Sequence, residues 1–183
     1  MLLLALLSLV ALAARTQRRL AIAGRRHAAN LERLADEDAL TGLANRRRLD
    51  ADLRKTGVEG AQVLVWDLDG FKSFNDSHGR AAGDQLPVSF ARELARTAGQ
   101  DGRAYRFGGD EFCVIADPGA DLRARALRLA AAPLGAGVTV TVGVASCPED
   151  APDVVAALRV ADERMYEAKR EKRRPRGALT SVS

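Results

Sequence analysis

Two glycines followed by two carboxylates, Gly108-Gly109-Asp110-Glu111, are the residues of this 183-residue chain whose types and spacing best suit chemistry. Short apolar runs flank them, Tyr105 to Phe107 and Phe112 to Ala116, and two such runs around a tight glycine turn predict a β-hairpin. Glycine tolerates positive φ and lets another molecule approach the backbone closely. Taken alone, the four residues fit a solvated hairpin tip equally well.

A second acidic cluster, Asp67-Leu68-Asp69, ends another apolar run, Gln62 to Leu68. Burial of Asp67 would cost free energy unless a cation or hydrogen bonds compensated for it. Carboxylates at neighbouring strand ends can hold hard divalent cations, and a bare glycine turn beside them leaves room for a phosphate chain. The two clusters together indicate a site for a metal ion and a phosphorylated ligand.

The elements that must position these residues alternate between helices and strands. We expect strands at 62–68 and 138–145 besides the hairpin, and helices at about 45–55, 82–98, 121–132 and 152–171. Pro87 falls near the first turn of its helix, where proline is tolerated. The predicted inward residues of the last helix are Val155, Leu158, Ala161, Met165 and Ala168. This order predicts an α/β (α+β) domain with one mixed sheet covered by helices.

The composition is that of a globular protein, with 47% hydrophobic and 28% charged residues. Aromatic residues make up only 4%, which argues against the stacking platforms of single-stranded nucleic-acid binders. Much of the net charge of +4 lies in residues 15–26 and 169–176, so we expect no nucleic-acid partner. Cys113 and Cys147 lack metal-ligand spacing and are interpreted as reduced, apolar residues of a cytosolic compartment.

Residues 2–14 are apolar apart from Ser8. Thirteen helical residues span about 20 Å, less than the hydrocarbon core of about 30 Å. Three interpretations remain open: a membrane anchor, a secretory signal, and a soluble or mis-started chain. The arginines that follow favour a cytoplasmic C-terminal part anchored at the inner face of the membrane. From residue 15 to 37 a helical stalk is expected, in which Leu20, His27 and Leu34 recur every seven residues and could pair two chains.

Six blocks in order along the chain resemble the GGDEF family of diguanylate cyclases. They cover roughly residues 36–174. The blocks are Asp38-x-Leu40-Thr41-Gly42-Leu43-x-Asn45-Arg46, Asp67-x-Asp69-x-Phe71-Lys72-x-x-Asn75-Asp76, Gly79 with Gly83-Asp84, Arg106 to Phe112, Val140 to Val144, and Ala161-Asp162-x-x-Met165-Tyr166-x-Ala168-Lys169.

The resemblance implies a palm-like nucleotidyl cyclase fold with a largely antiparallel sheet. It further implies that a homodimer condenses two GTP molecules into cyclic di-GMP and two pyrophosphates. The implied ligands of two Mg²⁺ or Mn²⁺ ions per half-site are Asp67, the Leu68 carbonyl, Asp110 and Glu111. The implied catalytic residues are Asp110, Glu111 and Lys72. The implied GTP contacts are Asn75 and Asp84 at the guanine, with Phe71, Lys72, Gly108, Gly109, Arg80, Lys169 and Arg173 elsewhere on the nucleotide.

The residue types suit this reaction independently of the resemblance. A ribose 3′-hydroxyl is a poor nucleophile, and metal coordination activates it and neutralises charge on the phosphoryl oxygens. Lys72 would add a point charge there. Aligning two substrates would supply much of the acceleration, which explains the need for a dimer.

The chain departs from the family pattern at several positions. Arg80 stands where the family often has His, and Lys172 replaces a common glycine. Gly99 and Gly102 stand at the two ends of the Arg-x-x-Asp motif that binds product in the family, so we expect that inhibition site to be absent. The segments 46–67 and 112–138 look shorter than usual.

These considerations divide the chain into an anchor-like segment (1–14), a helical stalk (15–37), a GGDEF domain (38–175) and a disordered tail (176–183). An alternative to an active cyclase is a GTP-binding or dimerising regulatory module without turnover. The upstream sensor or partner is not encoded in any segment that the sequence identifies.

Overall fold

The computed structural model describes residues 14–25, 27, 31, 34–55, 60–135 and 137–173. Contacts divide the chain into two compact units, residues 1–36 and 37–183. In the first unit the described residues are helical, and Leu20, Leu31 and Leu34 are exposed. The expected anchor, apart from Ala14, and the predicted tail lie outside the described residues. Among the residues that are described, no helix has both the length and the apolar character needed to cross a membrane.

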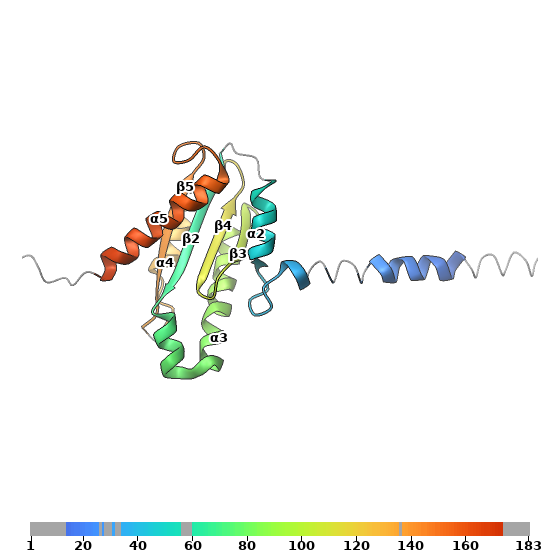
Figure 1. Ribbon diagram of the computed structural model, residues 1–183, viewed down its shortest axis with the longest axis horizontal. Coiled ribbons are helices and arrows are strands. Elements are labelled where there is room, and N and C mark those ends of the chain that lie inside the picture. The colour runs from blue at the N-terminus through green and yellow to red at the C-terminus, as the bar shows by residue number, and fades with distance from the viewer. Residues whose placement is uncertain are drawn as a thin grey trace, which may run out of the picture. The chain divides into compact units, whose positions relative to one another are not determined.

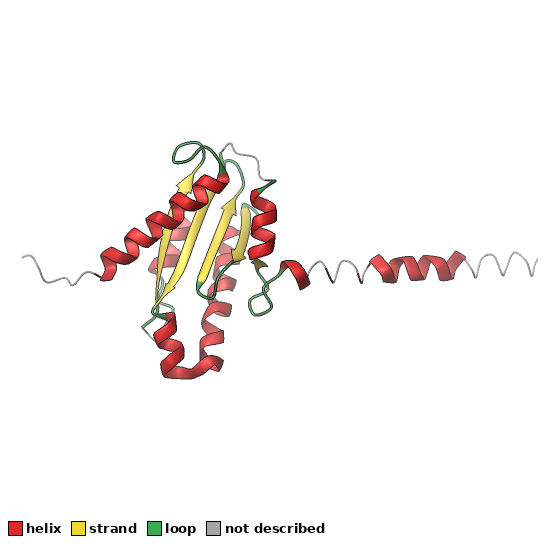
Figure 2. Ribbon diagram, viewed as in Figure 1, coloured by secondary structure: helices red, strands yellow, loops and turns green. Residues whose placement is uncertain are grey.

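The second unit is built on a five-stranded sheet with the order β1-β3-β4-β2-β5 (Figure 1, Figure 2). Its strands are β1 (Ala44–Asn45), β2 (Gln62–Asp69), β3 (Gly102–Arg106), β4 (Glu111–Ala116) and β5 (Thr139–Ser146). Only the β1–β3 pair of these strands is parallel, which confirms the mixed, largely antiparallel sheet. The helices are α2 (Arg46–Leu53), α3 (Phe71–Ala98), α4 (Arg123–Ala131) and α5 (Val154–Arg173).

Helices cover both faces of the sheet, so its inner strand β2 is apolar on both sides. In β2, Leu64, Trp66 and Leu68 pack in one cluster with residues of α3 and α4. The alternate residues Val63 and Val65 pack in the other cluster with residues of α2 and α5. Because side chains alternate along a strand, Asp67 and Asp69 share the α5 side with Val63 and Val65.

Helix α3 begins much earlier than the sequence predicted, at Phe71 instead of about residue 82. It consists of two rods joined at Gly79, whose φ of 77° and ψ of 165° break the helix (Figure 1). The prediction of a first-turn position for Pro87 was therefore wrong, because Pro87 lies inside the second rod and is buried. Phe71 and Phe74 pack partly buried against the core, and this tertiary contact accompanies helix formation in a segment rich in turn-forming residues.

Helix α5 begins at Val154, two residues later than predicted, and its buried positions follow the predicted period except in the first turn. Val155 is 56% exposed, contrary to the prediction, and Val154 and Ala157 are buried in its place. The helix lies very close to β5 at Gly143, where a Cβ would stand 1.9 Å from the Ala161 carbonyl oxygen. The cysteines are free and buried, and burial raises the pKa of both thiols.

Candidate active site

The sheet register brings the two acidic clusters together. Strands β2 and β4 are antiparallel, with Asp67 directly opposite Glu111. Paired residues on neighbouring strands present their side chains to the same face. Beyond this pair, the Leu68 amide donates a 3.1 Å hydrogen bond to the Asp110 carbonyl oxygen. The end of β2 is thus fixed directly against the hairpin turn.

The hairpin turn depends on the absence of a side chain at Gly108. A Cβ there would lie 2.2 Å from Glu111 Oε2, because the Glu111 side chain folds back over the turn. Arg106 stabilises the turn from its other side by donating a 2.7 Å hydrogen bond to the Gly109 carbonyl oxygen. The same guanidinium donates a 2.9 Å hydrogen bond to Asp38 Oδ1. Arg106 therefore joins the turn to the loop before β1.

Asp38 is itself held by its own loop. Its Oδ1 accepts hydrogen bonds from the Thr41 amide (2.9 Å) and the Thr41 hydroxyl (2.7 Å). Burial acts to raise the pKa of Asp38, but the bonds from Thr41 and Arg106 outweigh it and hold that pKa below its ordinary value. The carboxylate is therefore stabilised in its charged form.

The carboxyl groups at the end of β2 and in the hairpin interact unfavourably when all are charged. Burial, followed by the charges of Asp110 and Asp69, raises the pKa of Asp67 even though Lys169 acts in the opposite direction. Burial, followed by the charges of Asp110 and Asp67, likewise raises the pKa of Glu111. Crowded, partly buried carboxyl groups of this kind are typical of sites that bind cations.

Two lysines of α5 reach these carboxylates. Lys169 donates a short hydrogen bond to Asp67 Oδ1, and its ammonium lies 3.8 Å from Asp69 Oδ1. Lys172 lies 3.3 Å from Asp69 Oδ2. In the described part of the chain, no three acidic, histidine or cysteine side chains are gathered closely enough to bind a metal ion. The side chains as they stand therefore place an ammonium group where the sequence predicted a metal ion.

The two rods of α3 form a second polar feature around Asn75. Gly83 of the second rod faces Asn75 of the first, and a Cβ on Gly83 would stand 1.6 Å from Asn75 Oδ1. This amide oxygen is buried and accepts no hydrogen bond from any residue that the structure describes. A buried, unpaired amide oxygen costs free energy and is suited to a ligand that can donate to it.

The remaining predicted nucleotide contacts are solvent-accessible. Lys72, Arg80, Asp84 and Arg173 are exposed, and Phe71 is partly buried against the core. Arg80 directly follows the break at Gly79. The structure thus brings Asp67, Asp110, Glu111 and Lys169 together, while the other contacts line accessible parts of α3 and the end of α5.

Comparison with known proteins identifies the family. The model of the GGDEF domain of diguanylate cyclases matches residues 35–175. This chain belongs to the GGDEF family. The diguanylate cyclase TpbB of Pseudomonas aeruginosa is 40% identical over 167 residues, covering 79% of this chain and 38% of TpbB. An uncharacterized signaling protein of Caulobacter vibrioides is 36% identical over 154 residues, covering 74% of this chain and 19% of that protein.

A solved GGDEF structure agrees with the fold. The coiled coil and GGDEF domain of DgcB from Caulobacter crescentus, in complex with c-di-GMP, superimposes with a TM-score of 0.73 at 29% identity. That match covers 87% of this chain and 95% of the DgcB chain. This GGDEF chain spans less than two thirds of the length of TpbB and of the Caulobacter vibrioides protein.

The residues of this GGDEF domain fit the divalent cation that the family implies. Their carboxylate and carbonyl oxygens are the hard ligands that Mg²⁺ and Mn²⁺ prefer. The ammonium of Lys169 is a stand-in cation, which shows that Asp67 accepts a positive charge from the α5 side. Asp67 and Glu111 are paired across β2 and β4, so both carboxylates lie on the same face of the sheet.

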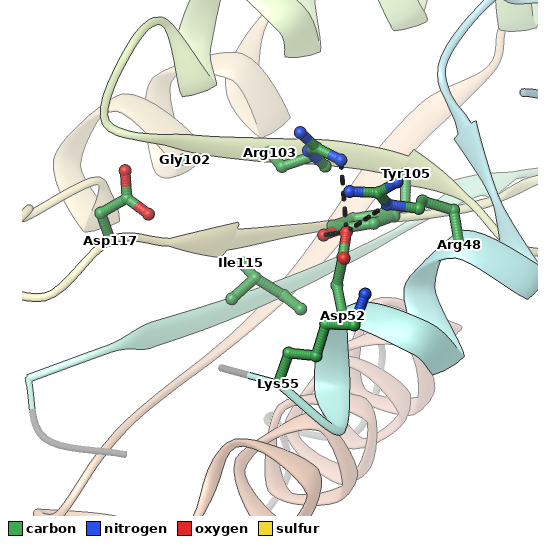
Figure 3. Close-up of a pocket in the computed structure, with 8 residues that line it drawn as sticks. All are labelled: Arg48, Asp52, Lys55, Gly102, Arg103, Tyr105, Ile115 and Asp117. Carbon is green, nitrogen blue, oxygen red and sulfur yellow. Dashed lines mark hydrogen bonds and ion pairs between the residues drawn. The ribbon is translucent and has the colours of Figure 1, made fainter. Parts of the chain in front are cut away.

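A separate cavity of about 300 Å³ lies beside β3 (Figure 3). One of its lining residues, Ile115, pairs with Val63 near the start of β2, whereas Asp67 lies near the other end of that strand. Asp52 is its polar centre and accepts hydrogen bonds from Arg48 (2.8 Å), Tyr105 (3.0 Å) and Arg103 (3.3 Å). Gly102 also lines it, and a Cβ on Gly102 would stand 2.7 Å from the Ile115 carbonyl oxygen. The backbone therefore leaves no room for the acidic side chain of the family's Arg-x-x-Asp motif at this position.

Sequence reasoning missed the contacts of two residues near the site. Lys172 was noted only as a replacement for glycine, although its position three residues after Lys169 puts both on one side of a helix. Arg106 was noted only as part of a motif. Nothing in the sequence paired Arg106 with Asp38, which is 68 residues away.

Proposed function

We propose that this chain is a diguanylate cyclase that condenses two GTP molecules into cyclic di-GMP and two pyrophosphates. The observation that carries the proposal is the pairing of Asp67 with Glu111 beside the bare turn at Gly108, with the ammonium of Lys169 against the same carboxylate. The arrangement offers oxygen ligands for divalent cations and cationic groups for a triphosphate at one end of the sheet.

Each part of the site has a defined task in this proposal. Asp67, the Leu68 carbonyl, Asp110 and Glu111 would hold Mg²⁺ or Mn²⁺, two ions per half-site. When bound, such ions activate the 3′-hydroxyl and neutralise charge on the phosphoryl oxygens. Gly108 and Gly109 keep the turn free of side chains, so that phosphate can approach the backbone amides. Lys72, Lys169 and Arg173 supply positive charge along the triphosphate, and Arg80 supplies one more at the start of the second rod of α3.

Guanine recognition is assigned to a cradle between the two rods of α3, formed by Asn75, Gly83 and Asp84. Asn75 Oδ1, buried and unpaired in the described structure, accepts a hydrogen bond from the base, and Asp84 accepts from its exposed side. Carboxylate and amide oxygens complement the N–H groups of guanine, and adenine presents a different pattern on that edge. The cradle therefore favours GTP over ATP.

A second subunit completes the reaction, because each domain supplies one GTP. The exposed leucines of the N-terminal unit, Leu20, Leu31 and Leu34, are suited to pairing two chains as a stalk. Attachment to a membrane through residues 1–14 belongs to the same proposal, and the arginines that follow favour a cytoplasmic catalytic domain. Alignment of two substrates by the dimer supplies much of the acceleration.

The experiment is to incubate the purified chain with GTP and Mg²⁺ and to separate the products by chromatography. We expect cyclic di-GMP and pyrophosphate in a one-to-two ratio, with a rate per subunit that rises with protein concentration. Asp110→Ala should abolish turnover while leaving the far-ultraviolet circular dichroism unchanged. Absence of cyclic di-GMP at high protein concentration would refute the proposal, and full activity of Asp110→Ala would refute the assignment of the ligands.

A regulatory GTP-binding module without turnover is the second candidate. Arg80, which stands where the family commonly has histidine, and the shortened segments 46–67 and 112–138 favour it. Tight, saturable GTP binding without product would identify this module.

A further inference from the structure

The two lysines at the end of α5 hold the acidic end of β2 in different ways. The ammonium of Lys172 donates to the Val140 carbonyl oxygen (2.6 Å) and the Thr141 hydroxyl (2.9 Å), besides its 3.3 Å contact with Asp69. The Val140 carbonyl and the Thr141 hydroxyl both belong to β5 and stay in place whatever binds to the carboxylates. Lys172 is therefore an anchor between α5 and β5.

Lys169 has no such neutral partners. Within the described chain, the polar groups against its ammonium are the carboxylates of Asp67 and Asp69. Its side chain is only 17% exposed and that of Asp67 only 10%, so the pair is largely shielded from water. A shielded carboxylate requires a counter-charge, and in this conformation Lys169 supplies it.

Asp69 forms no hydrogen bond with Lys169 in this arrangement of the side chains. Its Oδ2 already accepts from Thr139 (3.1 Å), Thr141 (2.6 Å) and Lys172. Its Oδ1 is buried, forms no hydrogen bond to any described group, and lies 3.8 Å from the Lys169 ammonium. Asp69 thus steadies the Lys169 ammonium by charge alone, and the single hydrogen bond to Asp67 fixes its position.

We propose that Lys169 is an exchangeable counter-ion, which a divalent cation displaces from Asp67 and which then becomes available to the triphosphate. A divalent cation on Asp67 repels the ammonium and removes the need for its charge, so metal binding frees Lys169. Lys172 keeps the end of α5 in place during the exchange, and only the Lys169 side chain has to move. Metal binding therefore releases the Lys169 amine for the triphosphate, and this amine couples metal binding to nucleotide binding.

This inference rests on the proposed function for the identity of the metal and the nucleotide. The exchange itself needs neither turnover nor a second subunit. It is therefore testable on metal binding alone, and its failure can be separated from that of the cyclase proposal.

The first experiment measures amine accessibility in the wild-type chain without nucleotide. A trace amount of an acetylating reagent is applied with and without Mg²⁺, and mass spectrometry quantifies acetylation of Lys169 and Lys172 in the same molecules. We expect Mg²⁺ to raise the acetylation rate of Lys169 at least threefold and to leave that of Lys172 unchanged. Equal rates for Lys169 with and without Mg²⁺, at concentrations that saturate the metal site, would overturn the proposal.

The second experiment measures Mn²⁺ affinity without nucleotide, by electron paramagnetic resonance of the free ion. Lys169→Met removes the competing ammonium and should tighten Mn²⁺ binding about tenfold, which corresponds to about 1.4 kcal/mol. Lys172→Met removes an equal charge from the same cleft and should change the affinity less than threefold, because Lys172 is half-exposed and its charge is screened. Unchanged or weaker binding by Lys169→Met, with a normal circular dichroism spectrum, would overturn the exchange.

Adding GTP separates the two proposals. If both hold, GTP with Mg²⁺ should protect Lys169 from acetylation again. Metal-induced exposure without protection by GTP would support the counter-ion exchange and contradict the triphosphate role of Lys169.

Discussion

Gly83→Ala is expected to weaken nucleotide binding while changing the stability of the fold little. The new Cβ would stand 1.6 Å from Asn75 Oδ1 and 2.8 Å from its Cγ. Ordinary contact requires about 3.5 Å, so the Asn75 amide must swing away by about 2 Å. The clash is with the end of a flexible side chain, which moves at little cost, but the amide leaves the cradle.

The two consequences have opposite signs. Gly83 lies inside the second rod of α3 without a positive φ, so alanine should favour the helix by about 0.5–1 kcal/mol. An off-rotamer Asn75 would cost about 0.5–1.5 kcal/mol, which leaves the free energy of unfolding within about 1 kcal/mol of wild type. Loss of the guanine hydrogen bond should cost about 1–3 kcal/mol, or about 5- to 150-fold in Kd.

The assay is isothermal titration with a non-hydrolysable GTP analogue and Mg²⁺, beside urea unfolding of each variant. Asn75→Ala is the matched control, because it removes the amide without adding an atom at Gly83. In that background Gly83→Ala should cause no further loss of affinity, since neighbouring residues that act through one contact are not additive. Wild-type affinity in Gly83→Ala, or an additive loss in the double variant, would refute the assignment of guanine binding to the Asn75 amide beside Gly83.

Three further substitutions, with Gly109→Ala as the control for the first, test packing and charges elsewhere in the domain. Gly143→Ala should destabilise the chain by about 3 kcal/mol or more in urea unfolding, because the added Cβ would clash with backbone atoms of α5. The control, Gly109→Ala, should change stability by less than about 0.5 kcal/mol, because a Cβ at Gly109 would have no atom within 4 Å. Asp38→Asn should lower the melting temperature at neutral pH by breaking the pair with Arg106. The folded-state pKa of Asp38 is lowered, so the stability that its charge contributes is complete above the ordinary value of 3.8 and is lost as the pH falls through the lowered value. The melting temperatures of wild type and variant should therefore converge at low pH. A difference that stays constant with pH would contradict this. Tyr105→Phe should cost about 1 kcal/mol by removing its hydrogen bond to Asp52, and unchanged unfolding would show that this bond contributes nothing.

The order of the elements could be predicted because hydrophobic periodicity and glycine turns mark it locally. The hairpin, β2, α2 and α5 all fall within a few residues of their expected bounds. The first rod of α3 could not be predicted, because Ser73, Asn75 and Asp76 favour turns and the helix also depends on contacts of its phenylalanines with the core. Strand β1 has two residues and is defined by pairings that no local pattern marks, with β3 and, through Ala44, with Glu37.

The site was predictable in its residue types but not in its pairing. Alternation along β2 placed Asp67 on a defined face, and the hairpin supplied Asp110 and Glu111. The register that sets Asp67 opposite Glu111 depends on the whole β2–β4 ladder, which no local pattern specifies. The partner of Asp67 was equally hidden, because Lys169 is 102 residues away.

The location of the acids explains why this domain carries its own cations. Asp67 follows four buried residues of the inner strand β2, and its side chain is only 10% exposed, so its carboxylate has little access to water. A buried carboxylate of this kind is stabilised by a nearby positive charge, and α5, which packs on this face of the sheet, supplies it through Lys169. A lysine is better suited to that task than an arginine, because a single flexible ammonium can leave one oxygen without breaking a two-point contact. With Lys172 where the family commonly has glycine, this chain fastens the end of α5 to β5 and leaves Lys169 free to exchange.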